Sequence, residues 1–186
     1  IFCPRGGQLY YWDATNDLTT RGVLVSSLTD ASGVPTLVNV VLVSDISRFV
    51  FALGCNEVGG STLDPMLIRW SDQELAQSWT PSALNQSGSL RLSRGTKIVT
   101  GVQARQEILV WTDNALYGLQ FLGGGDAWGA NLLGDNISIA SQNAAVYSNG
   151  TAYWMGKDRF YMYDGTVKTL RCDLRRYVFS DYSYEQ

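Results

Sequence analysis

The sequence contains no histidine. This excludes the Ser-His-Asp and Cys-His arrangements of nucleophilic catalysis, most zinc and iron sites, and the commonest general base. Charged residues are also few, at 17 % of the 186 residues, whereas hydrophobic residues make up 45 %. This is more apolar and less charged than an average soluble domain. We therefore expect a protein with a substantial buried core and no enzymatic activity.

Cysteine is scarce, with only Cys3, Cys55 and Cys172 at wide spacings and no C-x-x-C pair. The odd number and the spacing argue against a disulfide framework and against a zinc site. We expect unpaired thiols in a reducing compartment, and no metal or other cofactor. No apolar run approaches the length of about 18 residues that a membrane helix needs, so no membrane partner is expected. The chain opens on Ile1 rather than Met, and its first residues do not have the charged and apolar regions of a signal segment. We therefore expect a piece of a longer protein, with a processed product as the alternative.

Positive charge is limited as well. The net charge is −3 and the sequence pI is about 4.8, whereas nucleic-acid-binding domains are usually basic. One basic group lies near the C-terminus, formed by Lys168, Arg171, Arg175 and Arg176. We interpret it as a solvated or interface-facing stretch rather than as a phosphate-binding patch.

Three short apolar segments with the composition of buried strands recur along the chain. They read SRFVFALGC at 47–55, EILVWTD at 107–113 and TAYWMGKD at 151–158. Their β-branched and aromatic content, closed by polar or turn residues, predicts strands buried on both faces. Each has a candidate strand before it and another after it. The preceding strands are expected at 37–45, 96–104 and 143–150, and the following strands at 66–72, 115–121 and 159–165.

The first strands of these units begin at residues 37, 96 and 143. A period of roughly 40 to 60 residues with three or four strands per unit is typical of propeller blades. A small sheet cannot bury both of its faces alone, whereas stacked blades can. We therefore predict an all-β protein, part of a β-propeller over residues 1–186, with a β-sandwich as the alternative.

The blade units are expected at 37–72, 96–121 and 143–172, with a partial blade at 1–36 that contains QLYYWD at 8–13. Outer strands are expected at 21–28 and 166–172. Tight turns are expected around Asn114, Asn149–Gly150 and Gly156–Asp158. The stretch SDQELAQSWT at 71–80 could form one or two helical turns in a surface insertion.

Tryptophans and aspartates recur at the ends of these strands. Trp12, Trp70, Trp111 and Trp154 would be sugar-stacking platforms in a carbohydrate-binding propeller, but we favour packing between blades because they recur with the fold. Asp72, Asp113, Asp158 and Asp164 could supply the paired carboxylates of a glycoside hydrolase. We favour turn chemistry, because an Asp after a strand commonly hydrogen-bonds the nearby backbone.

Two further patterns have simpler explanations than a ligand. The glycines at 123–125, followed by Asp126, lack the Lys-Ser/Thr ending of a phosphate-binding loop, and we expect a flexible connection there. Glycosylation sequons occur at Asn85, Asn136 and Asn149. Of these, Asn149-Gly150 is explained by a hairpin turn.

Longer strings in the sequence resemble a family of bacteriophage virion proteins. They are DPMLIRWSDQELAQSWTPSALNQSG from 64, RGTKIVTGVQARQEILVWTDNALYGLQF from 94, NLLGDNISIASQNAAVYSNGTAYWMGKDRFYMYDG from 131, and RGGQLYYWD from 5. The resemblance covers most of the chain and is greatest to tail nozzle proteins of short-tailed phages, also called packaged-DNA stabilisation proteins.

This resemblance implies a structural role in the virion, assembled in the bacterial cytoplasm, with no catalytic residue. It implies copies of the chain arranged in a ring, a hexamer being one possibility, as part of the DNA exit channel. The other partners it implies are further tail proteins, portal or adaptor proteins, and genomic DNA in passing contact. A net acidic chain is compatible with sliding DNA, since Lys and Arg would hold its phosphates.

Overall fold

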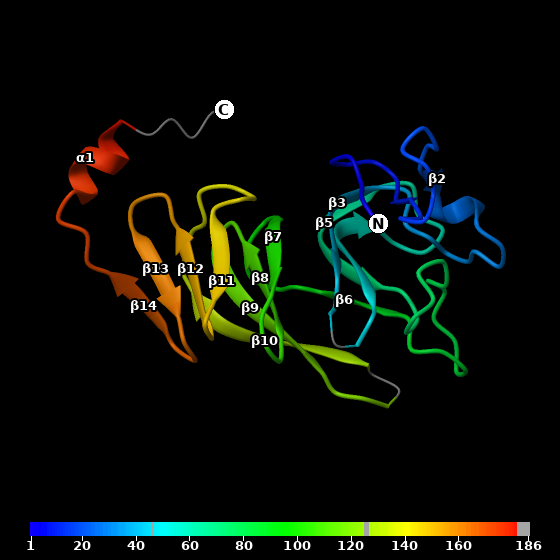
Figure 1. The fold of residues 1–186 in the computed structure, drawn as a ribbon. Helices are drawn as coiled ribbons and strands as arrows, with labels where there is room; N and C mark the ends of the chain where they lie inside the picture. The colour runs from blue at the N-terminus through cyan, green and yellow to red at the C-terminus, as the bar shows by residue number, and fades with distance from the viewer. Residues whose placement is uncertain (46, 125–126, 182–186) are drawn as a thin grey trace. The chain divides into compact units, whose positions relative to one another are not determined.

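The computed structural model describes residues 1–45, 47–124 and 127–181. The chain divides into two compact units. Unit 1 comprises Ile1–Ser93 and Phe121–Gly129, and unit 2 comprises Arg94–Gln120 and Ala130–Gln186. The described residues form one two-stranded and three four-stranded antiparallel sheets (Figure 1). The prediction of an all-β protein is confirmed.

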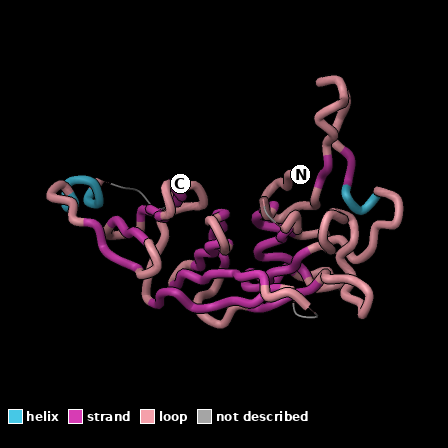
Figure 2. The backbone as a smooth tube through the Cα atoms, turned by 60° about the horizontal axis from the view of Figure 1, so that its bottom comes forward, coloured by secondary structure: helices cyan, strands magenta, loops and turns pink. Residues whose placement is uncertain are grey.

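Helix is confined to two short segments of the described residues, a 3-10 helix at Val25–Ser27 and α1 at Arg175–Ser180 (Figure 2). Neither was expected from the sequence. No helix in the described part of the chain has the length and apolar character to span a membrane.

The main sheet of unit 1 is a meander, in which consecutive strands pair in chain order. Its strands are β3 (Val38–Val43), β4 (Val50–Asn56), β5 (Leu63–Trp70) and β6 (Gly88–Arg91). All seven residues of β4 are buried, as the apolar run at 47–55 predicts. A β-bulge interrupts the pairing of β4 with β5 between Leu53 and Cys55. Gly54 occupies this bulge with φ 64°, a conformation that residues with a Cβ rarely adopt.

The N-terminal segment covers one face of this sheet. It contains a small sheet of β1 (Tyr10–Tyr11) and β2 (Val23–Leu24), so the strand expected at 21–28 is much shorter. Leu9 and Val25 from this segment join Val38, Ala52 and Leu67 in a buried apolar core. Trp79, 1 % exposed, belongs to the same core.

The expectation of helical turns at 71–80 is wrong. The backbone there folds back on itself, because the Asp72 N–H donates to the Ser78 carbonyl at 2.7 Å. The Trp79 N–H then donates to Ser32 in the N-terminal segment at 2.8 Å. Burial of the Trp79 indole in the core therefore determines the path of this loop, and helix propensity does not.

An aromatic cluster packs against the other face of the unit 1 sheet. The Trp128 ring meets Phe51 edge to face at 4.8 Å and Phe49 at 5.7 Å, and Phe121 lies 5.4 Å from Trp128. Because both faces of this sheet are covered, every residue of β4 is buried.

Unit 2 contains the other two four-stranded meanders. The first sheet consists of β7 (Ile98–Gln103), β8 (Ile108–Thr112), β9 (Ala115–Phe121) and β10 (Trp128–Asp135), the last with its start in unit 1. The second consists of β11 (Ala145–Ser148), β12 (Thr151–Met155), β13 (Phe160–Tyr163) and β14 (Val167–Leu170). The predicted turn at Asn149–Gly150 is confirmed, because both residues have positive φ and Ser148 pairs with Thr151.

These two sheets pack face to face (Figure 1). Leu109 and Trp111 of β8 and Leu116 of β9 meet Ala152 and Trp154 of β12 in one buried cluster. A single apolar layer therefore holds two consecutive meanders together.

The second strands of the three four-stranded sheets, β4, β8 and β12, differ in burial. Every residue of β8 is buried, like β4, whereas β12 alternates, with Tyr153 39 % exposed. The expectation that 151–158 is buried on both faces is therefore wrong, because only the face with Ala152 and Trp154 packs against a neighbouring sheet. Strands β6 and β10 were not expected.

Candidate functional site

The tryptophans of the repeated strands are packing residues. Trp111 and Trp154 are 0 % and 2 % exposed, and their rings meet at 5.4 Å. Trp70 is also buried and covers Gly88 in the paired strand β6. Trp111 and Trp154 pack between two sheets, as the packing interpretation expects, whereas Trp70 packs against residues of its own sheet. Trp12 is half-buried, and its Nε1 donates to the Thr20 carbonyl at 2.9 Å.

Asp72 and Asp113 hold backbone groups. The Asp72 carboxylate accepts from the N–H groups of Gln73 and Gln86, each at 2.9 Å, as expected of turn chemistry. Asp113 instead accepts from the N–H and the hydroxyl of Thr96, at 2.7 and 2.6 Å, and so holds the approach to β7. Burial tends to raise the pKa of Asp113, but these hydrogen bonds outweigh it and keep the pKa below its ordinary value.

The other two aspartates form ion pairs, and Asp164 also accepts from the Thr166 N–H, as expected of turn chemistry. Asp158 lies 2.6 Å from Arg159 and 3.2 Å from Arg175, and Asp164 lies 2.7 Å from Lys168. The hydrogen bonds from Arg159 and Lys168 lower the pKa of Asp158 and Asp164, respectively. A glycosidase acid needs the opposite shift, toward a raised carboxyl pKa. These pairs also engage two of the four residues of the basic C-terminal group.

The remaining candidate residues are structural. Asn85 donates to the Thr80 carbonyl and accepts from the Ser82 N–H, while Asn136 and Asn149 occupy turns with positive φ. The glycine cluster is described only as far as Gly124, and residues 125 and 126 lie outside the described residues.

The three cysteines are unpaired thiols, as expected. Burial raises the pKa of Cys55 to about 12, so this thiol stays protonated and unreactive at neutral pH. Among residues 1–45, 47–124 and 127–181, no group of three or more Cys, Asp or Glu side chains is placed to hold a metal ion.

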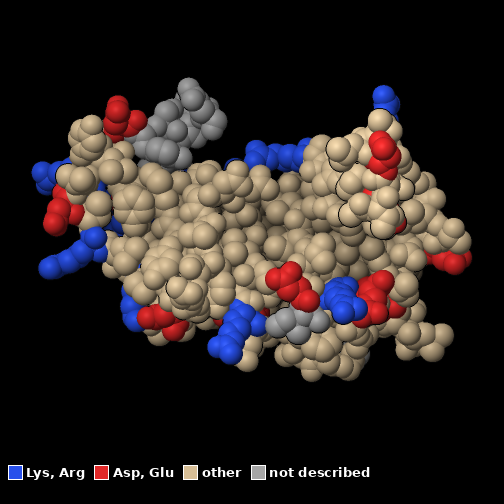
Figure 3. Space-filling view, in the orientation of Figure 1, with Lys and Arg blue, Asp and Glu red and all other residues tan. Residues whose placement is uncertain are grey.

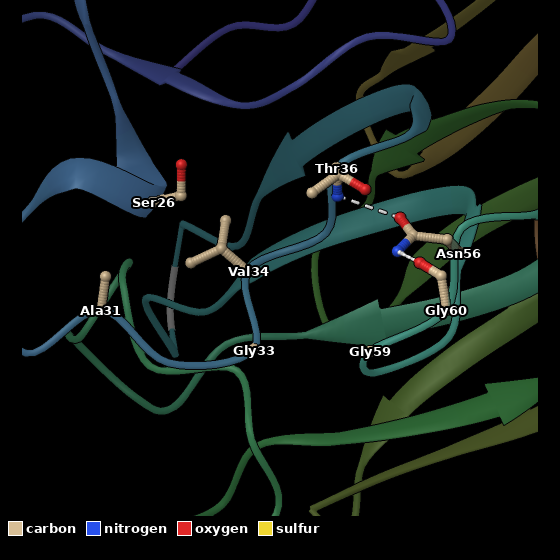
Figure 4. Close-up of a pocket in the computed structure, with 8 residues that line it drawn as sticks. All are labelled: Ser26, Ala31, Gly33, Val34, Thr36, Asn56, Gly59 and Gly60. Atoms are coloured by element: carbon tan, nitrogen blue, oxygen red, sulfur yellow. Dashed lines mark hydrogen bonds between the residues drawn. The ribbon is translucent and has the colours of Figure 1, made fainter.

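Unit 1 has a cavity of about 380 Å³ whose wall is built around Asn56 (Figure 4). The Asn56 side chain accepts from the N–H groups of Thr36 and Leu37 and donates to the carbonyls of Glu57 and Gly60. All its hydrogen-bonding positions are thereby used. Small residues line the rest, including Ala31, Gly33 and Gly59. This cavity therefore presents few side-chain groups to a ligand.

A buried arginine lies behind the same wall. Arg69 is 1 % exposed, and its guanidinium donates to the carbonyls of Gly33, Asn56 and Trp79. It also lies 5.9 Å from the centre of the Trp79 ring. Arg69 therefore joins the end of β4 to two loops of unit 1.

Unit 2 has a smaller cavity, of about 200 Å³, where three hairpin turns converge. Its wall includes Arg105, Glu107, Tyr147, Tyr163 and Asp164. The Tyr163 hydroxyl donates to Oε1 of Glu107 at 3.2 Å. Burial raises the pKa of Tyr163, and the nearby Glu107 carboxylate adds to the shift. Sequence reasoning did not identify this cavity, because its residues come from turns that are far apart in the chain.

Charged side chains do not form a single large patch on the face that Figure 3 shows. Basic and acidic groups are scattered there over a mostly uncharged surface. This distribution differs from the clustered basic surface of a dedicated nucleic-acid-binding domain.

Comparison of the sequence with models of protein families and with curated proteins found no match.

Proposed function

We propose that this chain is a structural, non-catalytic module of a bacteriophage virion, part of a nozzle-type tail or head–tail protein that assembles into a ring. In this proposal, its consecutive four-stranded sheets are blades of a β-propeller. The partners are other copies of the chain, neighbouring tail, portal or adaptor proteins, and DNA that passes through the channel.

The observation that carries the proposal is the stacking of two consecutive meanders in unit 2. Each sheet is formed by four strands in chain order, and the middle strands supply Trp111 and Trp154 to the shared core. Propeller blades have this connectivity. A β-sandwich also packs two sheets face to face, but its Greek-key connections usually carry the chain from one sheet to the other.

The chemistry of the carboxylates supports the non-catalytic part of the proposal. The pKa values of Asp113, Asp158 and Asp164 all lie below the ordinary value, so none is prepared to act as a proton donor near neutral pH. The hydrolase alternative therefore has no support from these residues. The assignment to a phage virion rests on the resemblance of residues 5–13, 64–121 and 131–165 to phage tail proteins.

Electron microscopy of the natural protein that carries this sequence tests the proposal. We expect closed rings with propeller-shaped lobes, and an antibody raised against the 186-residue chain should label one end of the phage tail. Monomeric particles without virion labelling would overturn the structural role. A density map in which the strands of unit 2 close as a two-layer sandwich would overturn the propeller.

A further inference from the structure

We propose that the 200 Å³ cavity of unit 2 binds a single neutral sugar ring, such as the terminal residue of a glycan. This inference does not depend on the virion proposal. It also does not involve the buried tryptophans, because Trp111 and Trp154 are at most 2 % exposed and cannot reach a ligand.

The wall of the cavity is held in place by hydrogen bonds. In the turn between β7 and β8, the Ala104 N–H donates to the Glu107 carbonyl at 2.9 Å, and Gln103 Nε2 donates to the Ala104 carbonyl at 2.6 Å. In the turn between β13 and β14, the Lys168 ammonium holds Asp164 at 2.7 Å. Gly150 contributes from the tight turn between β11 and β12. Ligand sites are usually preformed in this way.

Glu107 provides the main polar contact for a ligand. Its carboxylate has about four acceptor positions, and the Tyr163 hydroxyl uses one of them at Oε1. No other donor among the described residues reaches this carboxylate. Gly118 of β9 leaves room for it, since with a Cβ at that position the Glu107 carboxylate would have to move. Glu107 can therefore accept hydrogen bonds from two adjacent ligand hydroxyls.

The other wall residues complete a surface for a sugar. Tyr147 and Tyr163 are half-buried rings that rest on the core between the two sheets. Such rings pack against the C–H face of a sugar while the polar groups bind its hydroxyls. Arg105 and Gln106 are exposed donors at the rim.

Charge and size narrow the ligand class to a neutral ring. The positive charge of Arg105 offsets the negative charge of Glu107, and Lys168 neutralises Asp164. The cavity therefore favours neither an anionic ligand nor an ammonium group. The volume of about 200 Å³ lies below the roughly 300–1,000 Å³ of sites for drug-sized molecules. One monosaccharide ring therefore suits the cavity better than a larger ligand.

Nuclear magnetic resonance of the isotopically labelled 186-residue chain tests the proposal, with D-glucose, D-galactose, D-mannose and N-acetylglucosamine as probes. We expect at least one sugar to shift resonances of residues 104–107, 147–150 and 163–165, with saturation in the millimolar range. Glu107→Gln should weaken binding about tenfold or more, as expected for loss of a charge-assisted hydrogen bond. The matched control, Glu57→Gln at an exposed turn of unit 1, should leave the affinity unchanged.

Three outcomes of the sugar titrations would overturn the proposal: no shift with any of the four sugars, shifts confined to other residues, or equal weakening by both variants. Inorganic phosphate is a further probe, and its binding at the same residues in place of sugars would also overturn it. The dispersion of the Glu107→Gln spectrum shows whether that variant is folded. If it does not fold, Arg105→Gln replaces it, since Arg105 is exposed on the rim and outside the core. Arg105→Gln should then weaken sugar binding, and Glu57→Gln should not.

Discussion

The rings of Trp111 and Trp154 meet at 5.4 Å with an angle of 65° between their planes. The two residues come from the middle strands of consecutive sheets, β8 and β12. Edge-to-face contacts of this kind add stabilisation beyond the area buried. The contact therefore joins two sheets that would each otherwise expose an apolar face.

Truncation of this pair should be strongly destabilising. We expect Trp111→Ala and Trp154→Ala each to lower the free energy of unfolding by about 3–5 kcal/mol, because each leaves a large cavity in the shared core. Tyr153→Ala, on the exposed face of the same strand as Trp154, is the control and should cost less than about 1 kcal/mol. Urea unfolding followed by circular dichroism measures all three. Equal losses for Tyr153→Ala and Trp154→Ala would contradict this account of the core.

Much of the strand pattern was predictable from the sequence, because local signals and burial agree there. The apolar runs at 47–55 and 107–113 became fully buried strands, and Asn149–Gly150 formed its turn. Strand β6 reads GSLR and β10 reads WGANLLGD, and glycine and asparagine in these edge strands hide the pattern. Their pairing depends on partners such as Trp70, which covers Gly88.

The candidate sites were less predictable than the strands. The recurrence of tryptophans pointed correctly to packing, since it follows the repeat itself. The unit 2 cavity combines residues 104–107, 147–150 and 163–165, and no spacing within the sequence indicates that these turns meet. Arg69 gave no signal either, because the three carbonyls that it binds belong to residues 10 to 36 positions away from it in the chain.

Replacement of Arg69 should destabilise unit 1. Arg69→Met leaves three buried backbone carbonyls without their donor, and each unsatisfied group costs about 1–3 kcal/mol. We therefore expect a loss of about 3 kcal/mol or more, and a similar loss for Arg69→Lys, since one ammonium cannot match the guanidinium fork. Arg91→Met on the adjacent strand β6 removes only an exposed pair with Asp64 and should cost less than about 1 kcal/mol. Urea unfolding compares the variants, and a neutral Arg69→Met would refute the structural role.

Alanine substitutions at two glycines with positive φ distinguish the cost of backbone strain from the cost of steric contact. Gly54 and Gly59 have φ values of 64° and 73°, so alanine at either position carries a similar conformational cost of about 1 kcal/mol. At Gly54 an added Cβ would also lie 2.9 Å from Nδ2 of Asn39, whereas at Gly59 it would meet nothing within 4 Å. We expect Gly54→Ala to be the more destabilising by about 0.5–1.5 kcal/mol, because the Asn39 side chain must leave its rotamer to make room. Equal melting temperatures for the two variants would show that the bulge adapts without cost.

Stability should depend on pH only at the two ends of the range. The carboxyls with lowered pKa values in the folded chain are Asp13, Asp17, Asp64, Asp113, Asp158 and Asp164. A lowered pKa stabilises the fold above the unfolded value, near 3.9, and this stabilisation is lost as the pH falls through the folded pKa. We therefore expect the free energy of unfolding to drop below about pH 4.

At alkaline pH the free energy of unfolding changes in the opposite direction and falls as the pH rises. Burial raises the pKa values of Cys55, Tyr161 and Tyr163, so the unfolded chain loses these protons first and stability falls above about pH 8.5. Without histidine, no side chain with an ordinary pKa near 6.5 titrates between these limits. Urea midpoints measured from pH 3 to 10 should form a plateau from about pH 5 to 8. Asp113→Asn should flatten the acid slope and Cys55→Ala the alkaline slope, and a marked slope between pH 6 and 7 would contradict the assignment.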